Sequence, residues 1–457
     1  MTRILIDMQA CQTESRLRGI GRYAFELVHT MAQNPGGHEL HLLMNARFPE
    51  EARHLEKKFS DLLPLYRIHR FDALDHNHDR EPSNRWRKAA SALVRESFID
   101  RLEPDLVFCP SFFEGHIDNA VLSIGRLSTI PVAVTLHDLI PLIYRHDYLD
   151  RNPDYQEHYL AKVDELRRSA GLITISEASE RDGKDYLNLG TKPIVNASEA
   201  ADPMFRPVSI AEDDRQKLAA KFGIETPFIF YTGGSDHRKN LSRLISAFAQ
   251  LEGLTGKRLQ LVLAGSMPFS TQEYFRGEMQ AQSIANDRVL FPGYVSDEDL
   301  VKLYNAAELF IFPSLYEGFG LPCLEAMQCG TPVLAANASS LPEVVGTSIA
   351  LFDPLSVPAM VSAMAHVLVD DGFRQKLRTH GLTQAAKFSW RNTAQTTLSA
   401  LEDFSAGARA TEISGTHEDR LVKAIGAIPA SVGKPSRDDL ISLSRIIADM
   451  ARITGAP

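Results

Sequence analysis

The chain has 457 residues, of which 44% are hydrophobic and 23% are charged, and its formal net charge is −9. This composition is typical of a soluble globular protein, and the length predicts two or three domains. The acidic balance argues against a nucleic-acid-binding protein, which would usually carry a basic domain, so no nucleic-acid partner is expected.

The first half of the chain alternates short apolar runs with longer amphipathic runs, which predicts a parallel sheet with crossover helices. The predicted strands are Arg3–Met8, Glu39–Asn45, Asp105–Cys109, Pro131–Leu136 and Gly171–Ile175. The predicted helices are Gly21–Ala32, Asn84–Arg101, Pro153–Ser169 and Glu177–Leu189.

The second half repeats this alternation. Its predicted strands are Phe228–Thr232, Gln260–Ala264, Val289–Phe291, Leu309–Phe312 and Pro332–Ala335. Its predicted helices are Asn240–Leu251, Gln272–Ala285, Asp297–Ala307 and Leu321–Cys329. Two such sets predict two doubly wound α/β domains in tandem, with ligands bound beyond the carboxyl ends of the strands and in the cleft between the domains.

The domain boundary is expected in segment 196–203, which is rich in small residues and has no periodicity. In the C-terminal segment, apolar residues at helical spacing predict an amphipathic helix over 438–453. We therefore expect a first domain over 1–196, a second over 197–390, a helix closing the fold over 391–404, and a linker with a helical extension over 405–457.

The four cysteines, Cys11, Cys109, Cys323 and Cys329, are few for so long a chain. They indicate a reducing compartment, and we interpret them as buried structural thiols. The N-terminus lacks the apolar region of a secretion signal, and no window approaches the roughly 18 apolar residues of a membrane-spanning helix. A cytoplasmic protein is expected, and peripheral contact with the inner membrane face is left open.

The most informative motif runs from Tyr316 to Glu325, with the sequence YEGFGLPCLE. It follows a predicted buried strand, and Pro322 favours the first turn of a helix, so the motif reads as strand, glycine turn and helix. Such a turn presents backbone N–H groups to an anion, while Glu317 and Glu325 can accept hydrogen bonds from hydroxyls. Together these groups suit a sugar nucleotide.

A second anion-binding element is the run YTGGSDHRKN from Tyr231 to Asn240, in which a strand leads through glycines into a helix. Gly233 and Gly234 permit close backbone approach. Lys239 and Arg238 supply cations for a diphosphate whose charge grows as it leaves. A solvated surface charge is the alternative for Arg238.

The frame from Phe312 to Val333, FPSxxEGFGLPxxEAMxxGTPV, resembles the signature of retaining glycosyltransferases of family 4. The resemblance extends over residues 1 to about 404 and includes the motifs at 19–23 and 137–138. It implies the GT-B fold, in which two Rossmann-like doubly wound domains face each other across a cleft. It also implies a nucleotide-sugar donor on the second domain, an acceptor on the first, and transfer with retention without an obligatory metal or other cofactor.

The resemblance implies roles for individual residues. Glu317 would contact hydroxyls of the donor sugar, Glu325 those of the ribose, and Lys239 the phosphate. The family often has an arginine where this chain has Gly234, and Arg238 is the candidate substitute. Further donor contacts are implied for the loop beside the nucleobase and for backbone N–H groups of the glycine turn: Tyr294, Gly318, Phe319, Gly320 and Leu321.

Two motifs of the first domain are weaker on their own. Gly19-Ile20-Gly21-Arg22-Tyr23 imitates a dinucleotide fingerprint but lies about ten residues after its strand, so we interpret it as a flexible glycine loop that brings Gly21 close to the donor phosphate and acceptor. His137 ends a strand, where it either caps that strand or, as the resemblance implies, contacts the transferred sugar.

Two other patterns have competing interpretations. Asp297-Glu298-Asp299 matches a metal-binding Asp-x-Asp motif, but Ser296 before it favours the capped start of a helix, and no metal site is expected. The predicted helix over 84–101 carries four cations beside three large apolar residues. That pattern fits either a membrane-facing patch for a lipid-linked acceptor or a solvated face: Arg85, Arg87, Lys88 and Arg95, with Trp86, Leu93 and Phe98.

The sequence therefore predicts a retaining hexosyltransferase. It acts on a saccharide or lipid-linked saccharide and is similar to mannosyltransferases of bacterial surface polysaccharide synthesis such as O-antigen. GDP-mannose is the first expected donor, and the tail resembles linkers that precede a further transferase domain beyond residue 457. The alternatives are a sugar-nucleotide epimerase or disaccharide phosphorylase on the same fold, and a non-catalytic nucleotide-sugar-binding subunit.

Overall fold

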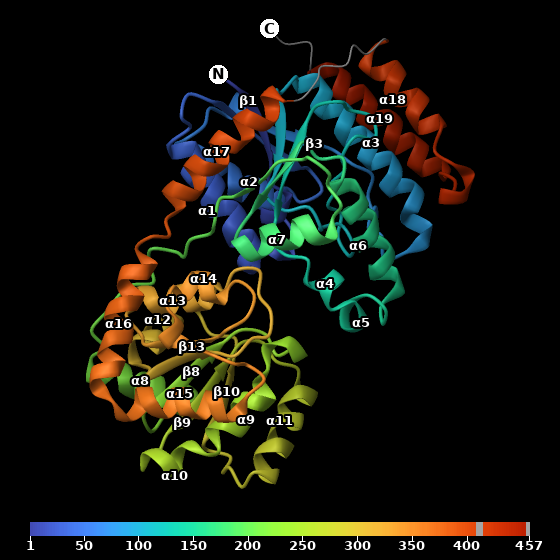
Figure 1. The fold of residues 1–457 in the computed structure, drawn as a ribbon. Helices are drawn as coiled ribbons and strands as arrows, with labels where there is room; N and C mark the ends of the chain where they lie inside the picture. The colour runs from blue at the N-terminus through green and yellow to red at the C-terminus, as the bar shows by residue number, and fades with distance from the viewer. Residues whose placement is uncertain (408–414, 454–457) are drawn as a thin grey trace. The chain divides into compact units, whose positions relative to one another are not determined.

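The computed structural model describes residues 1–407 and 415–453, which divide into two compact units (Figure 1). Unit 1 comprises Met1–Ile175, Ser179–Ser198 and the chain from Trp390 onward. Unit 2 comprises Ser176–Ala178 and Glu199–Ser389. Each unit is built on its own parallel sheet. The chain thus forms the first sheet, then the second, and returns to the first unit at Trp390.

The sheet of unit 1 has seven strands in the order β3-β2-β1-β4-β5-β6-β7, and every neighbouring pair is parallel. The inner strands are buried apolar runs, as expected when helices cover both faces of a parallel sheet. Strand order reverses between β1 and β4. The strands are β1 (Arg3–Asp7), β2 (Glu39–Asn45), β3 (Ile68–Phe71), β4 (Leu106–Cys109), β5 (Val132–Leu136), β6 (Gly171–Thr174) and β7 (Ile194–Asn196).

Most helices of unit 1 connect its strands, and three more come after unit 2 in the chain. Short 3-10 turns, η1 (Gln9–Cys11) and η2 (Glu14–Leu17), lie between β1 and the first helix. The α-helices are α1 (Gly19–Gln33), α2 (Pro49–Phe59), α3 (Arg85–Leu102), α4 (Ile140–Ile143), α5 (Arg145–Tyr148), α6 (Pro153–Leu166), α7 (Glu177–Tyr186), α17 (Trp390–Ala406), α18 (His417–Gly426) and α19 (Arg437–Ile453).

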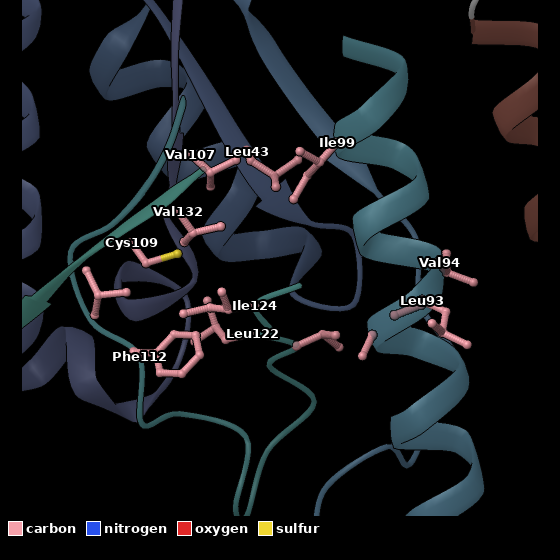
Figure 2. Close-up of a cluster of buried hydrophobic side chains, with 14 of the residues drawn as sticks. Leu43, Leu93, Val94, Ile99, Val107, Cys109, Phe112, Leu122, Ile124 and Val132 are labelled. Carbon is pink, nitrogen blue, oxygen red and sulfur yellow. The ribbon is translucent and has the colours of Figure 1, made fainter. Parts of the chain in front are cut away.

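The core of unit 1 lies between its sheet and α3 (Figure 2). Val107 of β4, Val132 of β5 and Ile99 of α3 belong to this cluster, and side chains from the segment after β4, such as Phe112, complete it. Arg95 of α3 is fully buried, and its Nη2 lies 2.6 Å from Asp7 Oδ2 at the end of β1. The core therefore contains a buried ion pair as well as apolar side chains.

The C-terminal helices pack against α3, which lies beside α18 and α19 in Figure 1. Leu421 of α18 and Leu443 of α19 are buried in the same cluster as Trp86 and Leu93. Arg87 Nε donates to Asp439 Oδ1 over 2.7 Å. The membrane-facing interpretation of this helix was wrong, because its three large apolar residues are buried against the core and the tail. The solvated interpretation holds for Arg85, which is exposed, but not for Arg95, which is buried.

The sheet of unit 2 has six parallel strands in the order β10-β9-β8-β11-β12-β13, which reverses between β8 and β11. The strands are β8 (Phe228–Thr232), β9 (Gln260–Ala264), β10 (Val289–Gly293), β11 (Leu309–Phe312), β12 (Val333–Ala336) and β13 (Leu351–Phe352). The helices are α8 (Glu212–Phe222), α9 (Leu241–Phe248), α10 (Leu251–Thr255), α11 (Phe269–Ala281), α12 (Asp297–Ala306), α13 (Leu321–Gln328), α14 (Leu341–Val345), α15 (Val357–Val369) and α16 (Asp371–Ala385).

Every strand predicted from the sequence is present, and β2, β8, β9 and β11 have the predicted bounds. Three strands were missed. β3, with the sequence Ile-His-Arg-Phe, lies at the sheet edge and is half-exposed, so it has no apolar run that would predict a strand. β7 and β13 were missed because they are only 3 and 2 residues long. All four cysteines are buried free thiols, as predicted. Among the described residues, no helix combines the length and apolar character required to cross a bilayer.

Candidate functional site

The switch point of the second sheet brings the two predicted anion elements together. β8 and β11 are hydrogen-bonded neighbours although β9 and β10 separate them in sequence. The loop after β8 leads to Lys239, and the loop after β11 leads to Glu317. In doubly wound sheets, connections depart to opposite faces at such a point and leave a crevice for ligands.

Three charged side chains meet there. Lys239 Nζ lies 2.6 Å from Glu317 Oε1, and Arg238 Nη1 lies 3.0 Å from Glu317 Oε2. Arg238 is also held by Asp236, whose Oδ1 lies 3.1 Å from its Nε, and it donates to the carbonyl of Tyr316 over 2.7 Å. Arg238 is therefore a fixed, largely buried cation, and the solvated alternative was wrong. Its contact with phosphate stays a prediction.

Glu317 is buried yet ionised. Burial raises the pKa of its carboxyl, but the neighbouring Lys239 and Arg238 outweigh that effect and hold the pKa below its ordinary value. Its two oxygens take one cation each, which fixes the orientation of all three groups. We call Lys239, Arg238 and Glu317 the charged triad.

The glycine turn after Glu317 is held by two serines. Ser340 Oγ donates to the carbonyls of Glu317, at 3.0 Å, and Phe319, at 2.6 Å. The N–H of Glu317 donates to Ser339 Oγ over 2.8 Å. Gly320 has φ of 109° and precedes α13, and a Cβ there would lie 2.6 Å from Leu341. The residues 318–321 therefore form the fixed entry to a helix N-terminus, as the sequence predicted.

Glu325 lies on α13, and its Oε2 accepts a hydrogen bond from the hydroxyl of Tyr304 over 2.8 Å. Its charge also acts on Glu199: burial, and then the charge of Glu325, raises the pKa of Glu199 to about 8. Tyr304 and Glu199 were missed from the sequence, because one sits inside an ordinary amphipathic helix and the other in the boundary segment. The predicted contact of Glu325 with a ribose stays a prediction.

The other predicted donor residues lie on loops at the carboxyl ends of the same sheet. The N–H of Gly233 donates to the carbonyl of Ala264 over 3.1 Å, and the carbonyl of Gly234 accepts from the hydroxyl of Tyr231 over 2.7 Å. Tyr294 follows β10 and is 79% exposed. Its ring is thus accessible, and its contact with a nucleobase stays a prediction.

Unit 1 has a cavity of about 360 Å³ beyond the carboxyl ends of β1, β4 and β5. Its lining includes His137 after β5, together with Ser111, Glu114 and Asp118 after β4. These β4-loop residues were missed, because none belongs to a contiguous motif. We call this space the His137 cavity.

His137 is held in its neutral form. Its Nε2 lies 2.8 Å from the carbonyl oxygen of Pro110, which can only accept, so this nitrogen carries the proton. Burial lowers the pKa of His137 to about 4, and the ring of Tyr23 packs edge-on at 4.8 Å. The contact with Pro110 also anchors the loop after β4, so His137 does more than cap its strand.

Buried carboxyls of the same cavity are shifted toward their neutral forms. Burial raises the pKa of Glu114 and that of Asp118. Ser111 Oγ donates to Glu114 Oε1 over 2.7 Å. Within residues 1–407 and 415–453, Glu114 Oε2 is buried and meets no hydrogen-bond partner. The cavity therefore offers hydrogen-bonding groups whose pKa values are shifted toward the neutral form, and one carboxyl oxygen among them is unsatisfied.

The glycine motif of the first unit differs from its prediction. Residues 19–23 form the first turns of α1 and are not a flexible loop. Gly21 is buried, and a Cβ there would lie 2.3 Å from the Cα of Arg16 and the carbonyl oxygen of Ser15. Gly21 therefore allows η2 to pack directly on α1. A donor contact by Gly21 stays a prediction.

The acidic run 297–299 has the structural role that the sequence favoured. Ser296 Oγ accepts a hydrogen bond from the N–H of Asp299 over 3.3 Å, and α12 begins at Asp297. Asp299 also pairs with Lys221. The residues thus form a capped helix start.

Comparison with solved structures identifies the architecture as GT-B. Sucrose-phosphate synthase from Thermosynechococcus elongatus matches with a TM-score of 0.64 at 19% identity over 89% of this chain and 100% of that one. The Anabaena protein HepE, solved in complex with UDP and glucose, matches with a TM-score of 0.64 at 17% identity over 88% of this chain and 100% of that one. At such identities the likeness concerns the fold.

Sequence comparison supplies the family. Residues 17–195 match the model described as Glycosyltransferase Family 4, and residues 214–384 match the model described as Glycosyl transferases group 1. The O-antigen chain mannosyltransferase B of Escherichia coli is 32% identical over 396 residues, which cover 84% of this chain and 96% of that protein. The chain belongs to the family 4 glycosyltransferases, as its sequence frame predicted.

A second relative is longer than this chain. The serotype-specific mannosyltransferase WbdA of Escherichia coli is 34% identical over 394 residues, which cover 86% of this chain and 47% of that protein. The chain thus spans about half the length of the WbdA proteins it matches.

Proposed function

We propose that this chain is a retaining mannosyltransferase of surface polysaccharide synthesis. It transfers mannose from GDP-mannose to a hydroxyl of a saccharide or lipid-linked saccharide and requires no metal ion. The observation that carries the proposal is the charged triad at the β8–β11 switch point beside the N-terminus of α13. The names of the E. coli relatives support mannose as the sugar.

The triad suits the leaving diphosphate. Without a ligand, the carboxylate of Glu317 pairs with the positive charges of Lys239 and Arg238 and holds both side chains in place. These are the charges that a bound diphosphate would contact. A diphosphate would bind against the positive charge of Lys239 and Arg238, while Glu317 accepts hydrogen bonds from hydroxyls of the sugar. Charge-assisted hydrogen bonds of this kind contribute roughly 1.5–3 kcal/mol each.

In the transfer step, the bond between C1 of the sugar and the diphosphate oxygen breaks as C1 bonds to the acceptor oxygen on the same face. The acceptor proton passes to an oxygen of the departing diphosphate. The protein stabilises the charge on that leaving group through Lys239, Arg238 and the helix N-terminus, whose groups are already oriented. No protein nucleophile is required.

The His137 cavity suits a saccharide acceptor. The pKa values of its His137 and Glu114 are shifted toward the neutral forms, which suit hydroxyls, since these exchange hydrogen bonds without carrying charge. Glu114 Oε2 is buried without a partner in the described part of the chain, and an acceptor hydroxyl would supply one. We propose that the accepting sugar binds there.

A donor screen tests the proposal. Calorimetric titration of the purified chain with GDP, UDP, ADP and their common sugars should show the tightest binding for GDP and GDP-mannose. NMR of the product should then show a new α-mannoside, formed in the presence of EDTA. Tighter binding of UDP would reject GDP-mannose, and loss of activity with EDTA would reject a metal-independent reaction.

The same experiment separates the alternative functions. An epimerised donor would indicate an epimerase, and mannose phosphate formed from a mannoside and free phosphate would indicate a phosphorylase. Binding of a nucleotide sugar without turnover on any saccharide would indicate a non-catalytic subunit.

A further inference from the structure

Unit 1 has a second cavity, of about 520 Å³, that the proposed reaction does not use. It lies between η2, the first turns of α1, and α2, and its apolar lining comes from Leu17, Phe25 and Leu55. Its volume falls within the roughly 300–1,000 Å³ of small-molecule sites. We call it the α1–α2 cavity.

The α1–α2 cavity adjoins the His137 cavity across the turn η2. Glu14, Ser15 and Arg18, from η2 and the residue after it, line the His137 cavity, whereas Arg16 and Leu17 line the α1–α2 cavity. A 3-10 helix has about three residues per turn, so successive side chains leave it in different directions. One short turn therefore separates the two spaces.

The turn η2 is fixed in this position. Gly21 has no Cβ and lets the backbone of Ser15 and Arg16 rest on α1. Thr13 Oγ1 accepts a hydrogen bond from the N–H of Ser15 over 3.3 Å, and Arg16 Nη2 lies 3.4 Å from Glu51 Oε1 of α2. The turn η2, which separates the two cavities, therefore contacts both helices that line the α1–α2 cavity.

The lining of the α1–α2 cavity combines apolar surface with balanced charge. Its cations are Arg16, Arg22 and Lys58, and its carboxylates are Glu26, Glu50 and Glu51, so three positive charges face three negative ones. A site for a phosphate or another anion would carry excess positive charge. An uncharged ligand with both apolar faces and hydroxyls fits this lining best, and a saccharide has both.

We infer that the α1–α2 cavity is a remote acceptor subsite, which binds sugar residues of the acceptor beyond the one held in the His137 cavity. Leu17 is 68% exposed at its rim and provides apolar surface where the saccharide crosses η2. The inference rests on the proposed saccharide acceptor. It specifies that the substrate is an oligosaccharide and that the enzyme prefers longer acceptors to single sugars.

Kinetics with acceptors of increasing length test the subsite. We expect kcat/KM of the wild type to rise from methyl mannoside to longer mannan fragments. Leu17→Asp places a charge at the rim and should lower kcat/KM for the longer fragments about tenfold, through KM, with the value for methyl mannoside unchanged. Leu65→Asp is the matched control, because Leu65 is 70% exposed on the same unit and does not line the cavity.

Three outcomes would overturn the subsite: a wild type indifferent to acceptor length, a Leu17→Asp variant that loses activity equally on all acceptors, or a Leu65→Asp variant with the same loss. If no mannoside is elongated, the proposed function fails, and direct binding then decides the subsite. Calorimetry should show that mannan fragments bind the wild type and Leu65→Asp about tenfold more tightly than Leu17→Asp. Equal affinities, or no binding to any of them, would reject the inference.

Discussion

The two units place polar groups at the same location, beyond the strand ends at a switch point, but shift the pKa values of their carboxyls in opposite directions. In unit 2, Glu317 is ionised, and neighbouring cations hold its pKa low. In unit 1, burial raises the pKa of Glu114 and lowers that of His137, which keeps both closer to neutral. Charged groups match a diphosphate, and neutral groups match hydroxyls. The same fold thus provides two chemically different sites.

The buried charges of the two units also differ in what surrounds them. The Arg95–Asp7 pair of unit 1 is sealed in the core, with both side chains 1% exposed. The charged triad of unit 2 follows the carboxyl ends of the central strands β8 and β11, where ligands bind in such sheets. We therefore expect the first pair to stabilise the fold and the triad to serve the reaction, and three predictions test this distinction.

The largest expected effect is on the stability of unit 1. Arg95→Met leaves Asp7 buried without its cation and should lower the free energy of unfolding by about 3–5 kcal/mol. Both tryptophans, Trp86 and Trp390, belong to unit 1, so urea unfolding followed by tryptophan fluorescence reports on this unit. Arg87→Met removes the more exposed pair with Asp439 and should cost less than about 1 kcal/mol. Equal losses would contradict a special role for the buried pair.

The next effect is on catalysis by unit 2. Lys239→Met removes one cation of the charged triad and should reduce kcat for transfer from GDP-mannose by about 10²–10³, the usual loss when one charge-stabilising donor is deleted. The control is Lys217→Met, because Lys217 is an exposed residue of the same unit that pairs with Asp213. Activity of Lys239→Met within threefold of the control would show that the triad is structural, like Arg95–Asp7.

The smallest effect concerns the pH dependence of stability. It sharpens the comparison because Glu199 is a carboxyl of unit 2 that is kept neutral, whereas Glu317 of the same unit is ionised. The pKa of Glu199 is raised from 4.5 to about 8, so the folded state holds a proton that the unfolded state has lost. The resulting stability is fully present below pH 4.5 and is lost as the pH rises toward 8. Within this window the wild type should lose about 1.4 kcal/mol per pH unit relative to Glu199→Gln.

Hydrogen exchange of unit 2 peptides across the pH window measures this difference. Parallel pH profiles for the wild type and Glu199→Gln would show that Glu199 is ionised in the folded protein. Glu180→Gln, on a partly exposed residue of unit 1, is the control and should leave the profile of unit 2 unchanged.

The sequence predicted the strands, turns and helix around the charged triad because each of these motifs is contiguous. Glu317, Gly320 and Glu325 lie in one strand–turn–helix motif, and the glycine loop with Lys239 is a second compact motif. Their convergence required only that both motifs follow strands that are neighbours in the sheet. The ion pairs within the charged triad were not predicted, because the register and loop conformation determine which side chains touch.

The lining of the His137 cavity was largely missed for the converse reason. The His137 cavity is assembled from loops after three strands, and residues such as Ser111 and Glu114 have no motif that distinguishes them. Arg95 was misassigned because a cation on an amphipathic helix normally faces solvent, and only the fold places Asp7 beside it. Gly21 was interpreted as part of a flexible glycine loop, but a glycine is needed there because the backbone of η2 packs directly against it.

The return of the chain to unit 1 at Trp390 has a consequence for the order of folding during synthesis. Trp390 packs against Tyr23, Phe404 fills the space beside Gly171, and Leu421 and Leu443 cover α3. These partners leave the ribosome only after the whole of unit 2 has been made. Unit 2 can therefore complete its core first, whereas the sheet of unit 1, although translated earlier, waits for its covering helices.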